Sequence, residues 1–349
     1  MLVSASHEPG AQHPPAMAQL PMSDVAEAPV RIASIGLASW DHFLAVDHFP
    51  VVGAYQKVVA ERSVPGGQGA NTAVALARLG AVVRVASLVG EDDEGARVRQ
   101  ALTAEGVDTT WLGTRSGEAT DRSTIVVSTD PPDRTIFWHR GAELQRGDQL
   151  DVAAIFNHDV VILGVADAAL RRFLVDLPAH TAPRARLLGP MTFLLEDSFH
   201  DGFEIALRHD VIVGSERELL ALSGTWTLAD AVTAIQTRMP GSNLRGCVVT
   251  RGAAGCRVVT REERWQLPAF PVTAVDPTGA GDAFAAGVAY GLARRWEWPR
   301  IAQFANAMGA LATRALGAQA ALPGLDEVNH LIASAGDRPG VDANEPRHE

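Results

Sequence analysis

DPTGAGDAFAAGVAYGL, residues 276–292, is the part of the sequence from which the architecture of the chain is most readily inferred. The apolar run 272–275 predicts a strand that leads into the glycine turn, and 283–292 predicts a helix that follows it. Glycine and alanine let backbone N–H groups approach a ligand closely, and a helix N-terminus carries about half a positive charge. The segment therefore predicts a cradle for a phosphate group.

Asp282 is the candidate catalytic residue of this stretch. It lies at the mouth of the predicted helix, where a carboxylate is placed to accept a proton from an attacking hydroxyl group. The alternative is that Asp282 only stabilises the start of the helix, as acidic residues commonly do. The turn by itself leaves both interpretations open.

A second glycine turn, Gly66-Gly67-Gln68-Gly69-Ala70-Asn71, precedes a predicted helix that ends at Gly80. It predicts a backbone-lined floor for a hydroxylated ligand, because the amide of Asn71 offers both a donor and an acceptor. The alternative is an ordinary connection with Asn71 near the helix cap.

Strands and helices alternate along the chain. Helical segments separate short apolar runs that predict buried strands, at 31–36, 82–89, 160–163, 186–188, 211–213 and 247–249. This pattern predicts an α/β fold with a mostly parallel sheet covered on both faces. Residues 41–64 and 120–142 interrupt the alternation, and they predict antiparallel ribbons that form a small lid over a ligand site.

The basic residues exclude two large classes of phosphate-transfer protein. Lys57 is the only lysine among 30 basic residues, and no glycine loop surrounds it. A P-loop needs lysine directly before serine or threonine, and protein kinases need a lysine on a strand. The net charge of -11 argues in addition against a nucleic-acid-binding protein.

Composition also bears on location and domain organisation. Cys247 and Cys256, predicted to lie buried on neighbouring strands, fit a reducing compartment, so we expect a cytoplasmic protein. No apolar run reaches the ~18 residues of a membrane span, and the start of the chain lacks the apolar core of a secretory signal. Residues 1–29 and 335–349 predict disordered tails around one folded domain, residues 30–334.

Several motifs, in this order, resemble the ribokinase-like, or PfkB, family of sugar and nucleoside kinases. PGGQGANTAVALARLG is similar to the first signature of the family and DPTGAGDAFAAGVAYGL to the second, while VGEDDEG, VTRGAAG and NAMGALATRALGAQAALP also match. The resemblance implies a ribokinase-like three-layer α/β/α fold with a small antiparallel β lid. It also implies an ATP-dependent carbohydrate kinase that phosphorylates a sugar hydroxyl.

The resemblance implies roles for the matching residues. Asp282 would be the general base, and the amides of Gly279, Ala280 and Gly281 would form the anion hole for the transferred phosphoryl group. The residues expected to line the substrate pocket are Asp41, Gly67, Gln68, Asn71 and, from the lid, Arg140.

The same resemblance implies sites for the nucleotide and for ions. The nucleotide site would include Ser215, Glu218, Thr250, Gly252, Gly255 and Asn306. Glu218 would hold magnesium through water, although Ser215 stands where the family motif has asparagine. Many family members also bind potassium, which here would lie near Asp276, Thr278, Ala312, Ala315 and Gly317.

Two departures from the family pattern bear on the substrate. Ribokinases carry a glutamate where this chain has Gly164-Val165-Ala166, so strict ribose specificity is not expected. Gln68 stands where phosphosugar kinases of the family often have lysine, which favours a neutral sugar. We therefore expect a small ribose- or ketose-like substrate.

Two alternatives stay open. A nucleoside kinase of the same family would need an apolar shelf for the base, which Trp40, Phe43 and Trp138 offer. A non-catalytic sugar- or nucleotide-sensing protein would be expected to have lost Asp282. In either case, a homodimer joined through the lids is predicted by the apolar alternation at Val58, Ala60, Ile125 and Val127.

Overall fold

The computed structural model describes residues 28–130, 132–177, 185–195, 199–335 and 341–342. Its large sheet contains β1 (Arg31–Gly36), β4 (Val82–Gly90), β5 (Asp108–Arg115), β8 (Val160–Gly164), β9 (Arg186–Pro190), β10 (Val211–Ser215), β11 (Gly246–Thr250), β12 (Cys256–Val259), β13 (Arg264–Leu267) and β14 (Val341–Asp342). Within the described ranges the strand order is β14-β13-β12-β11-β10-β9-β8-β1-β4-β5. Neighbours from β5 to β11 are parallel, whereas β12, β13 and β14 are added antiparallel at one edge.

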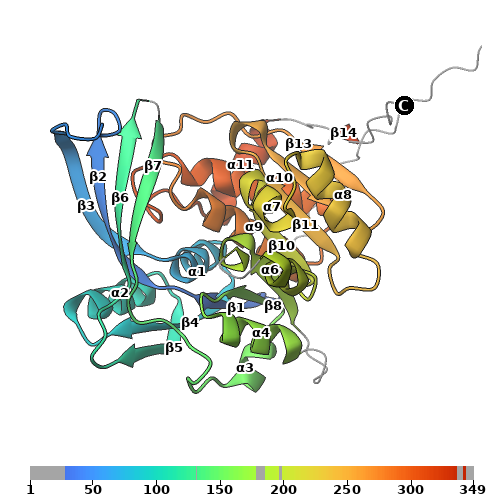
Figure 1. The fold of residues 1–349 in the computed structure, drawn as a ribbon, viewed down its shortest axis with the longest axis horizontal. Coiled ribbons are helices and arrows are strands. Elements are labelled where there is room, and N and C mark those ends of the chain that lie inside the picture. The colour runs from blue at the N-terminus through green and yellow to red at the C-terminus, as the bar shows by residue number, and fades with distance from the viewer. Residues whose placement is uncertain (1–27, 131, 178–184, 196–198, 336–340, 343–349) are drawn as a thin grey trace, which may run out of the picture.

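Helices cover both faces of this sheet (Figure 1). One face carries α1 (Gln68–Arg78), α2 (Asp93–Ala104), α9 (Ala280–Ala293), α10 (Trp298–Ala312) and α11 (Leu325–Ser334). The other carries α3 (Val152–Phe156), α4 (Ala168–Asp176), α5 (Met191–Leu194), α6 (Phe199–Ala206), α7 (Glu216–Ser223) and α8 (Leu228–Arg238). The three-layer α/β/α architecture expected from the sequence is confirmed.

Strand β8 shows why its sequence is apolar without interruption. Val160 and Ile162 point into the core beneath α1 and α9, whereas Val161 and Leu163 point into the core beneath α4 and α7. A strand buried on both faces has no polar side, so the run VVIL carries no alternation. The two cysteines follow the same logic, since Cys247 and Cys256 are buried on the paired strands β11 and β12.

The strand order places a topological switch point between β1 and β8. From β1 the chain continues outward to β4 and β5 on one side, while β8 to β11 extend on the other side. In open α/β sheets the crevice outside the carboxyl ends of the strands at such a point is where ligands bind. The fold therefore directs attention to Gly36 and Gly164, the last residues of β1 and β8.

The small sheet is the lid expected from the sequence, and it stands to one side of the molecule (Figure 1). It consists of β2 (Ser39–Val46), β3 (Val58–Gly66), β6 (Arg122–Thr129) and β7 (Pro132–His139) in the order β3-β2-β6-β7. Each predicted ribbon is an antiparallel pair, and the two pairs are joined by parallel pairing of β2 with β6.

The lid face that carries Ile125 and Val127 was expected to pack against a partner's lid, but it packs within the same chain. Ile125 and Val127 are 2% and 1% exposed, because they pack with Phe43 inside the lid and against Val64 and Leu316 of the same chain. They are therefore not available to a partner's lid. Other apolar side chains of the lid are exposed, namely Val58, Val59, Ile136, Phe137 and Trp138. Ile136 pairs with Ile125 and lies on the same face of the sheet, whereas Phe137 lies on the opposite face.

The prediction of a strand at residues 272–275 was wrong. The segment has no regular structure, because the N–H groups of Val275 and Asp276 donate to the carbonyl of Thr313 in a connection rather than to a neighbouring strand. The expected tails lie almost entirely outside the described residues, but Val341–Asp342 pair with β13. No helix among the described residues is long and apolar enough to cross a membrane.

Candidate active site

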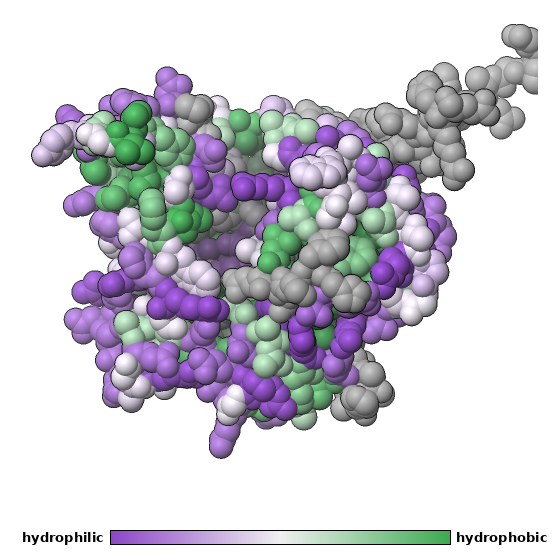
Figure 2. Space-filling view, viewed as in Figure 1, coloured by the Kyte–Doolittle hydropathy of each residue, from purple (hydrophilic) through white to green (hydrophobic). Residues whose placement is uncertain are grey.

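The two glycine turns of the sequence meet beside the switch point of the sheet. Gly69, in the first turn of α1, lies so close to Gly36 that a Cβ on it would come within 2.7 Å of the Gly36 carbonyl carbon. The N-terminal turns of α1 and α9 are joined by a hydrogen bond from the Nδ2 of Asn71 to the Oδ2 of Asp282, at 2.8 Å. Figure 2 shows the surface hollowed between the lid and the main body.

Gly279 is the N-cap of α9 and requires glycine for two reasons. Its φ of 79° lies in the left-handed region, and a Cβ would lie 2.5 Å from the carbonyl oxygen of Ala318. Two residues on, Gly281 is exposed, and a Cβ there would meet nothing within 4 Å. The start of α9 thus has open space beside Gly281, whereas the amide of Ala280 donates to the carbonyl of Pro277 at 3.2 Å. An anion at a helix N-terminus needs such space.

Asp282 lies in the first turn of α9, where its carboxylate faces this space. Burial raises the pKa of Asp282 to about 6, and the hydrogen bond from Asn71 and the charge of Arg134 oppose the shift. The negative charges of Asp41 and Glu218 raise the same pKa. A carboxyl group with this pKa is ionised at neutral pH and basic enough to accept a proton.

Asp41, on β2, is a second buried carboxylate of the site. It is 5% exposed, and its Oδ1 accepts a hydrogen bond from the hydroxyl of Ser39 at 2.7 Å. Burial raises the pKa of Asp41 to about 6, against hydrogen bonds from Ser39 and from the backbones of Ser123 and Gly67. A Cβ at Gly66 would lie 1.9 Å from its Oδ2, so the glycine makes room for this carboxylate.

Gln68 fills the space at the switch point itself. A Cβ at Gly164 would lie 1.8 Å from the Oε1 of Gln68, and one at Gly36 would lie 2.8 Å from it. The Nε2 of Gln68 donates to Thr72, while Oε1 is buried and has no hydrogen-bond partner within the part of the chain that is described. Gly67, before it, is the N-cap of α1 with φ 87°. The acceptor of Gln68 is thus an unsatisfied buried polar atom at the switch point, of the kind that calls for a functional explanation.

The residues expected around a potassium ion lie in two connections that are tied together. The buried carboxylate of Asp276 accepts from the amide and hydroxyl of Thr278 and, through Oδ2, from the amide of Gly317 at 2.8 Å. Ala312 ends α10, and Ala315 follows it on the same connection as Gly317. Because the Asp276 side chain is used in this way, backbone carbonyls are the groups left to face an ion.

Glu218 forms a capping box at the start of α7. Its carboxylate accepts from the amide and hydroxyl of Ser215 and from the hydroxyl of Thr192, while the Ser215 hydroxyl accepts from the amide of Glu218. Both carboxylate oxygens have partners, which suits contact with a metal through water rather than directly. Within the described ranges, no group of three or more His, Cys, Asp or Glu is placed to hold a metal.

The residues expected at the nucleotide lie farther along the same edge of the sheet. Thr250 ends β11, and the 3-10 turn Gly252–Ala254 follows it, with Gly252 at φ 54° and Gly255 at φ 89°. A Cβ at Gly255 would lie 1.9 Å from the carbonyl oxygen of Leu267, so glycine is required there. Asn306, on α10, donates to the carbonyl of Pro268. Within the described ranges these residues share no hydrogen bond with Asp282, and Asn306 is buried.

The base of the lid contains an acid that the sequence analysis missed. Asp121 is 2% exposed and accepts hydrogen bonds from the indole of Trp138 at 2.7 Å and from the amide of Gly141. Burial raises the pKa of Asp121 to about 7. Arg140 lies over the ring of Trp138 and pairs with Glu143 at 3.1 Å, so it is already engaged within the lid.

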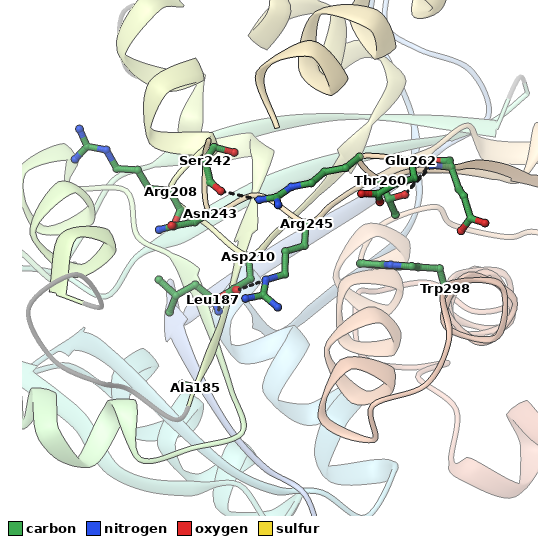
Figure 3. A pocket seen from close by; sticks show the side chains of 12 residues that line it. Ala185, Leu187, Arg208, Asp210, Ser242, Asn243, Arg245, Thr260, Glu262 and Trp298 are labelled. Carbon is green, nitrogen blue, oxygen red and sulfur yellow. Dashed lines mark hydrogen bonds and ion pairs between the residues drawn. The ribbon is translucent and has the colours of Figure 1, made fainter. Parts of the chain in front are cut away.

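A cavity of about 770 Å³ lies at the other end of the sheet, near the amino ends of β9, β10 and β11. Arg245 points toward Asp210, with which it forms an ion pair (Figure 3). Arg261 donates to the backbone carbonyl of Ser242. Trp298 forms one wall. This cavity contains none of the residues predicted to act in catalysis.

Comparison with known proteins agrees with the fold and identifies the family. The model of the pfkB family carbohydrate kinases matches residues 30–325. The chain is 28% identical over 312 residues to a ribokinase of Bacillus subtilis, which covers 86% of this chain and 99% of that protein. It is 34% identical over 289 residues to a fructokinase of Klebsiella pneumoniae, covering 77% of this chain and 92% of that protein.

The fold is shared with a solved structure, that of Arabidopsis thaliana ribokinase complexed with ribose and ATP. The TM-score is 0.71 at 21% identity, covering 88% of this chain and 99% of the other. The family match spans most of the sequence, including both glycine turns. The chain belongs to the pfkB family of carbohydrate kinases and is a sugar or nucleoside kinase.

Proposed function

We propose that this protein transfers the γ-phosphoryl group of ATP to a hydroxyl of a small neutral sugar, with Asp282 as the general base. The observation that carries the proposal is the position of Asp282. Its carboxylate lies in the first turn of α9, next to the exposed Gly281, with a pKa that burial raises to about 6. A base is useful near the pH at which it can both hold and release a proton.

In the proposed step, Asp282 takes the proton of the sugar hydroxyl as its oxygen forms a bond to the γ-phosphorus. The bond from that phosphorus to the bridging oxygen of ATP breaks, and ADP leaves with the electron pair. The amides of Gly279, Ala280 and Gly281 would donate to the phosphoryl oxygens, where negative charge collects in the transition state. No lysine is needed for this arrangement, since amides and the helix N-terminus supply the positive potential.

Asp41, Gly67, Gln68 and Asn71 would hold the sugar. Asp41 offers a buried acceptor for sugar hydroxyls, and the unpartnered Oε1 of Gln68 offers another. The absence of an acid at Gly164 separates this pocket from that implied for ribokinases, and the similar fructokinase is consistent with a ketose. Arg140 is paired with Glu143, so we propose that it contacts the substrate only if that ion pair breaks.

For the nucleotide, we propose that Thr250, Gly252 and Gly255 lie along the phosphates and ribose and that Asn306 lies beside the adenine. Ser215 and Glu218 would contact magnesium through water, and the ion would neutralise charge on the phosphates. Potassium would be held by backbone carbonyls near Asp276, Thr278, Ala312, Ala315 and Gly317. Unchanged activity when potassium is replaced by a large organic cation would exclude the potassium site.

A nucleoside kinase is the second candidate, because Trp138 presents a ring at the base of the lid that Asp121 holds in place. Phe43 no longer supports this alternative, since it is fully buried inside the lid. We further propose a cytoplasmic enzyme that dimerises through the exposed apolar side chains of the lid, such as Phe137. Light scattering that gives the mass of a single 37.0 kDa chain would contradict the dimer.

The experiment that tests the function is a screen for ADP release with neutral sugars and nucleosides, using the wild type, Asp282→Asn and Asp326→Asn. Asp326 is an exposed acid in the first turn of α11, so it is a matched control for a helix-start role. Asp282→Asn is expected to lose roughly 10²–10⁴-fold in turnover while it still binds nucleotide. Binding of sugar or nucleotide without any turnover by the wild type would favour a sensing protein instead.

A further inference from the structure

Asn71 uses the two ends of its amide for two different partners. Its Nδ2 donates to the Oδ2 of Asp282 at 2.8 Å, and its Oδ1 accepts from the Nε2 of Gln319 at 2.9 Å. Asn71 and Gln319 are 4% and 8% exposed, so water does not compete freely for either bond. The three side chains therefore form a row, buried at Asn71 and Gln319, that ends at the partly exposed proposed base.

The chemistry of the carboxylate determines which way both amides point. An ionised carboxylate only accepts hydrogen bonds, so Asn71 must present its NH₂ group to Asp282. Its oxygen then faces Gln319, which must in turn present its own NH₂ group. A rotated Asn71 amide would set oxygen against carboxylate at one end and NH₂ against NH₂ at the other.

The backbone of Gln319 is itself held in place. One guanidinium nitrogen of Arg78, on α1, donates to the carbonyls of Gln319 and Leu322 at 3.0 and 2.8 Å. The other side of the guanidinium forms two hydrogen bonds with the carboxylate of Glu105. The turn that carries Gln319 is thus fixed to the same helix that carries Asn71.

We propose that Gln319 is a positioning residue that sets the amide of Asn71 so that its NH₂ group always faces Asp282. This inference rests on the proposed role of Asp282 as the base. Gln319 does not touch the reacting atoms and acts only through Asn71. Its donor keeps the Asn71 amide from rotating, which holds the carboxylate of Asp282 in one place and favours its ionised form.

Other charged groups also act on Asp282, and they remain when Gln319 is changed. Arg134 of β7 lowers the pKa of Asp282, whereas Asp41 of β2 and Glu218 of α7 raise it. The hydrogen bond from Asn71 is the largest influence that opposes the effect of burial. Weakening that bond therefore raises the pKa of the base, and the protein then needs a higher pH for the same activity.

The test is the pH dependence of kcat/KM for Gln319→Met, which keeps the length of the side chain but removes the donor. We expect a roughly 10-fold loss near pH 6.5, the worth of a hydrogen bond that acts on a charged group, with partial recovery toward pH 8.5. Gln236→Met is the control, because Gln236 donates to the carbonyl of Thr260, remote from the site. That variant should keep the wild-type pH profile.

A double variant shows whether Gln319 acts through Asn71. Asn71→Leu combined with Gln319→Met should be no less active than Asn71→Leu alone, because the second change then has nothing left to position. An unshifted acidic limb in Gln319→Met, or additive losses in the double variant, would overturn the inference. If Asp282→Asn keeps wild-type turnover, the proposed function itself fails, whatever Gln319→Met does.

Discussion

Asn71 and Asp282 are 211 positions apart in the sequence, and their side chains are joined by a hydrogen bond of 2.8 Å. The bond links the first turns of α1 and α9, so that the floor of the proposed sugar pocket and the proposed phosphate cradle form one site. Two helix N-termini that converge in this way bring positive potential from two directions to one place. The arrangement suits a reaction in which negative charge moves between two oxygens.

Two acids with raised pKa values, Asp282 and Asp41, should make the fold less stable as the pH rises. The pKa of Asp282 and that of Asp41 are both raised by burial to about 6, from 3.8. The folded state therefore binds more protons than the unfolded state between about pH 4 and 6, and stability falls as the pH increases through this range. Asp282→Asn should have a higher Tm than the wild type at pH 7.5, with a difference that shrinks toward pH 4.5.

Thermal unfolding at pH 4.5, 6.0 and 7.5 measures this effect. Asp326→Asn is the control, because that acid is exposed and should change the Tm little at any of these pH values. A lower Tm for Asp282→Asn than for the wild type at pH 7.5 would show that the carboxylate stabilises the fold, contrary to the prediction.

Gly279→Ala should lower the stability of the fold, whereas Gly281→Ala should weaken the use of ATP. At Gly279 the left-handed backbone costs an alanine roughly 1–2 kcal/mol, and the Cβ would also press on the carbonyl of Ala318, so the free energy of unfolding should drop. At Gly281 the Cβ would enter open space. That variant should keep its stability but show a higher KM for ATP, because the methyl group occupies the space proposed for phosphate.

Denaturant unfolding and ATP titrations on the two variants distinguish these outcomes. Equal stability of both variants would contradict the argument from the Gly279 backbone. An unchanged KM for ATP in Gly281→Ala would place the phosphates elsewhere.

Gly164→Ala should change the kinetics with the sugar but not those with ATP. The new Cβ would lie 1.8 Å from the Oε1 of Gln68, so the glutamine must leave the switch point. We expect the KM for the sugar to rise several-fold, while the KM for ATP changes little. Gly147→Ala, at an exposed glycine whose Cβ would meet nothing within 4 Å, is the matched control. A variant with wild-type sugar kinetics would remove Gln68 from the pocket.

Ser215→Ala should destabilise the protein by about 1 kcal/mol, the typical worth of an N-cap side chain. The change also removes one donor to Glu218, which frees that carboxylate to move. Ser223→Ala, at the other end of α7, is the control, since its hydroxyl bonds to carbonyls of its own helix and to the hydroxyl of Thr225, caps no helix amide and should matter less. Chemical denaturation of both variants gives the comparison, and equal losses would argue against the capping role.

Local patterns in the sequence predicted the layers of the fold well. The uninterrupted run VVIL of β8 and the glycines at 279 and 67 carry physical requirements, namely burial on both faces and a positive φ, that are legible without a structure. The failed strand at 272–275 shows the limit of such patterns. Its apolar residues resemble a strand, but its N–H groups go to Thr313, about forty positions away.

Two residues of the site, Gln319 and Asp121, were not predicted, because their roles depend on hydrogen bonds to side chains elsewhere in the sequence. Gln319 was visible as the single polar side chain in ALGAQAALP, yet its meaning comes from Asn71, 248 positions away. Asp121 reads as an ordinary turn acid until Trp138 is seen to donate to it. Likewise, the alternation at Ile125 and Val127 predicted a covered face correctly, but it could not say that the same chain covers it.

Leu316 contacts the lid, whereas the next residue, Gly317, is hydrogen-bonded to the main body. Its side chain packs in the apolar centre of the lid, and its carbonyl accepts a hydrogen bond from Arg62 of β3. The next amide, that of Gly317, is held by Asp276 just before the glycine turn of α9. Residues 316–317 therefore connect the lid directly to the segment that precedes the glycine turn of α9. A rigid-body movement of the small sheet would displace this connection, and with it the start of the proposed phosphate site.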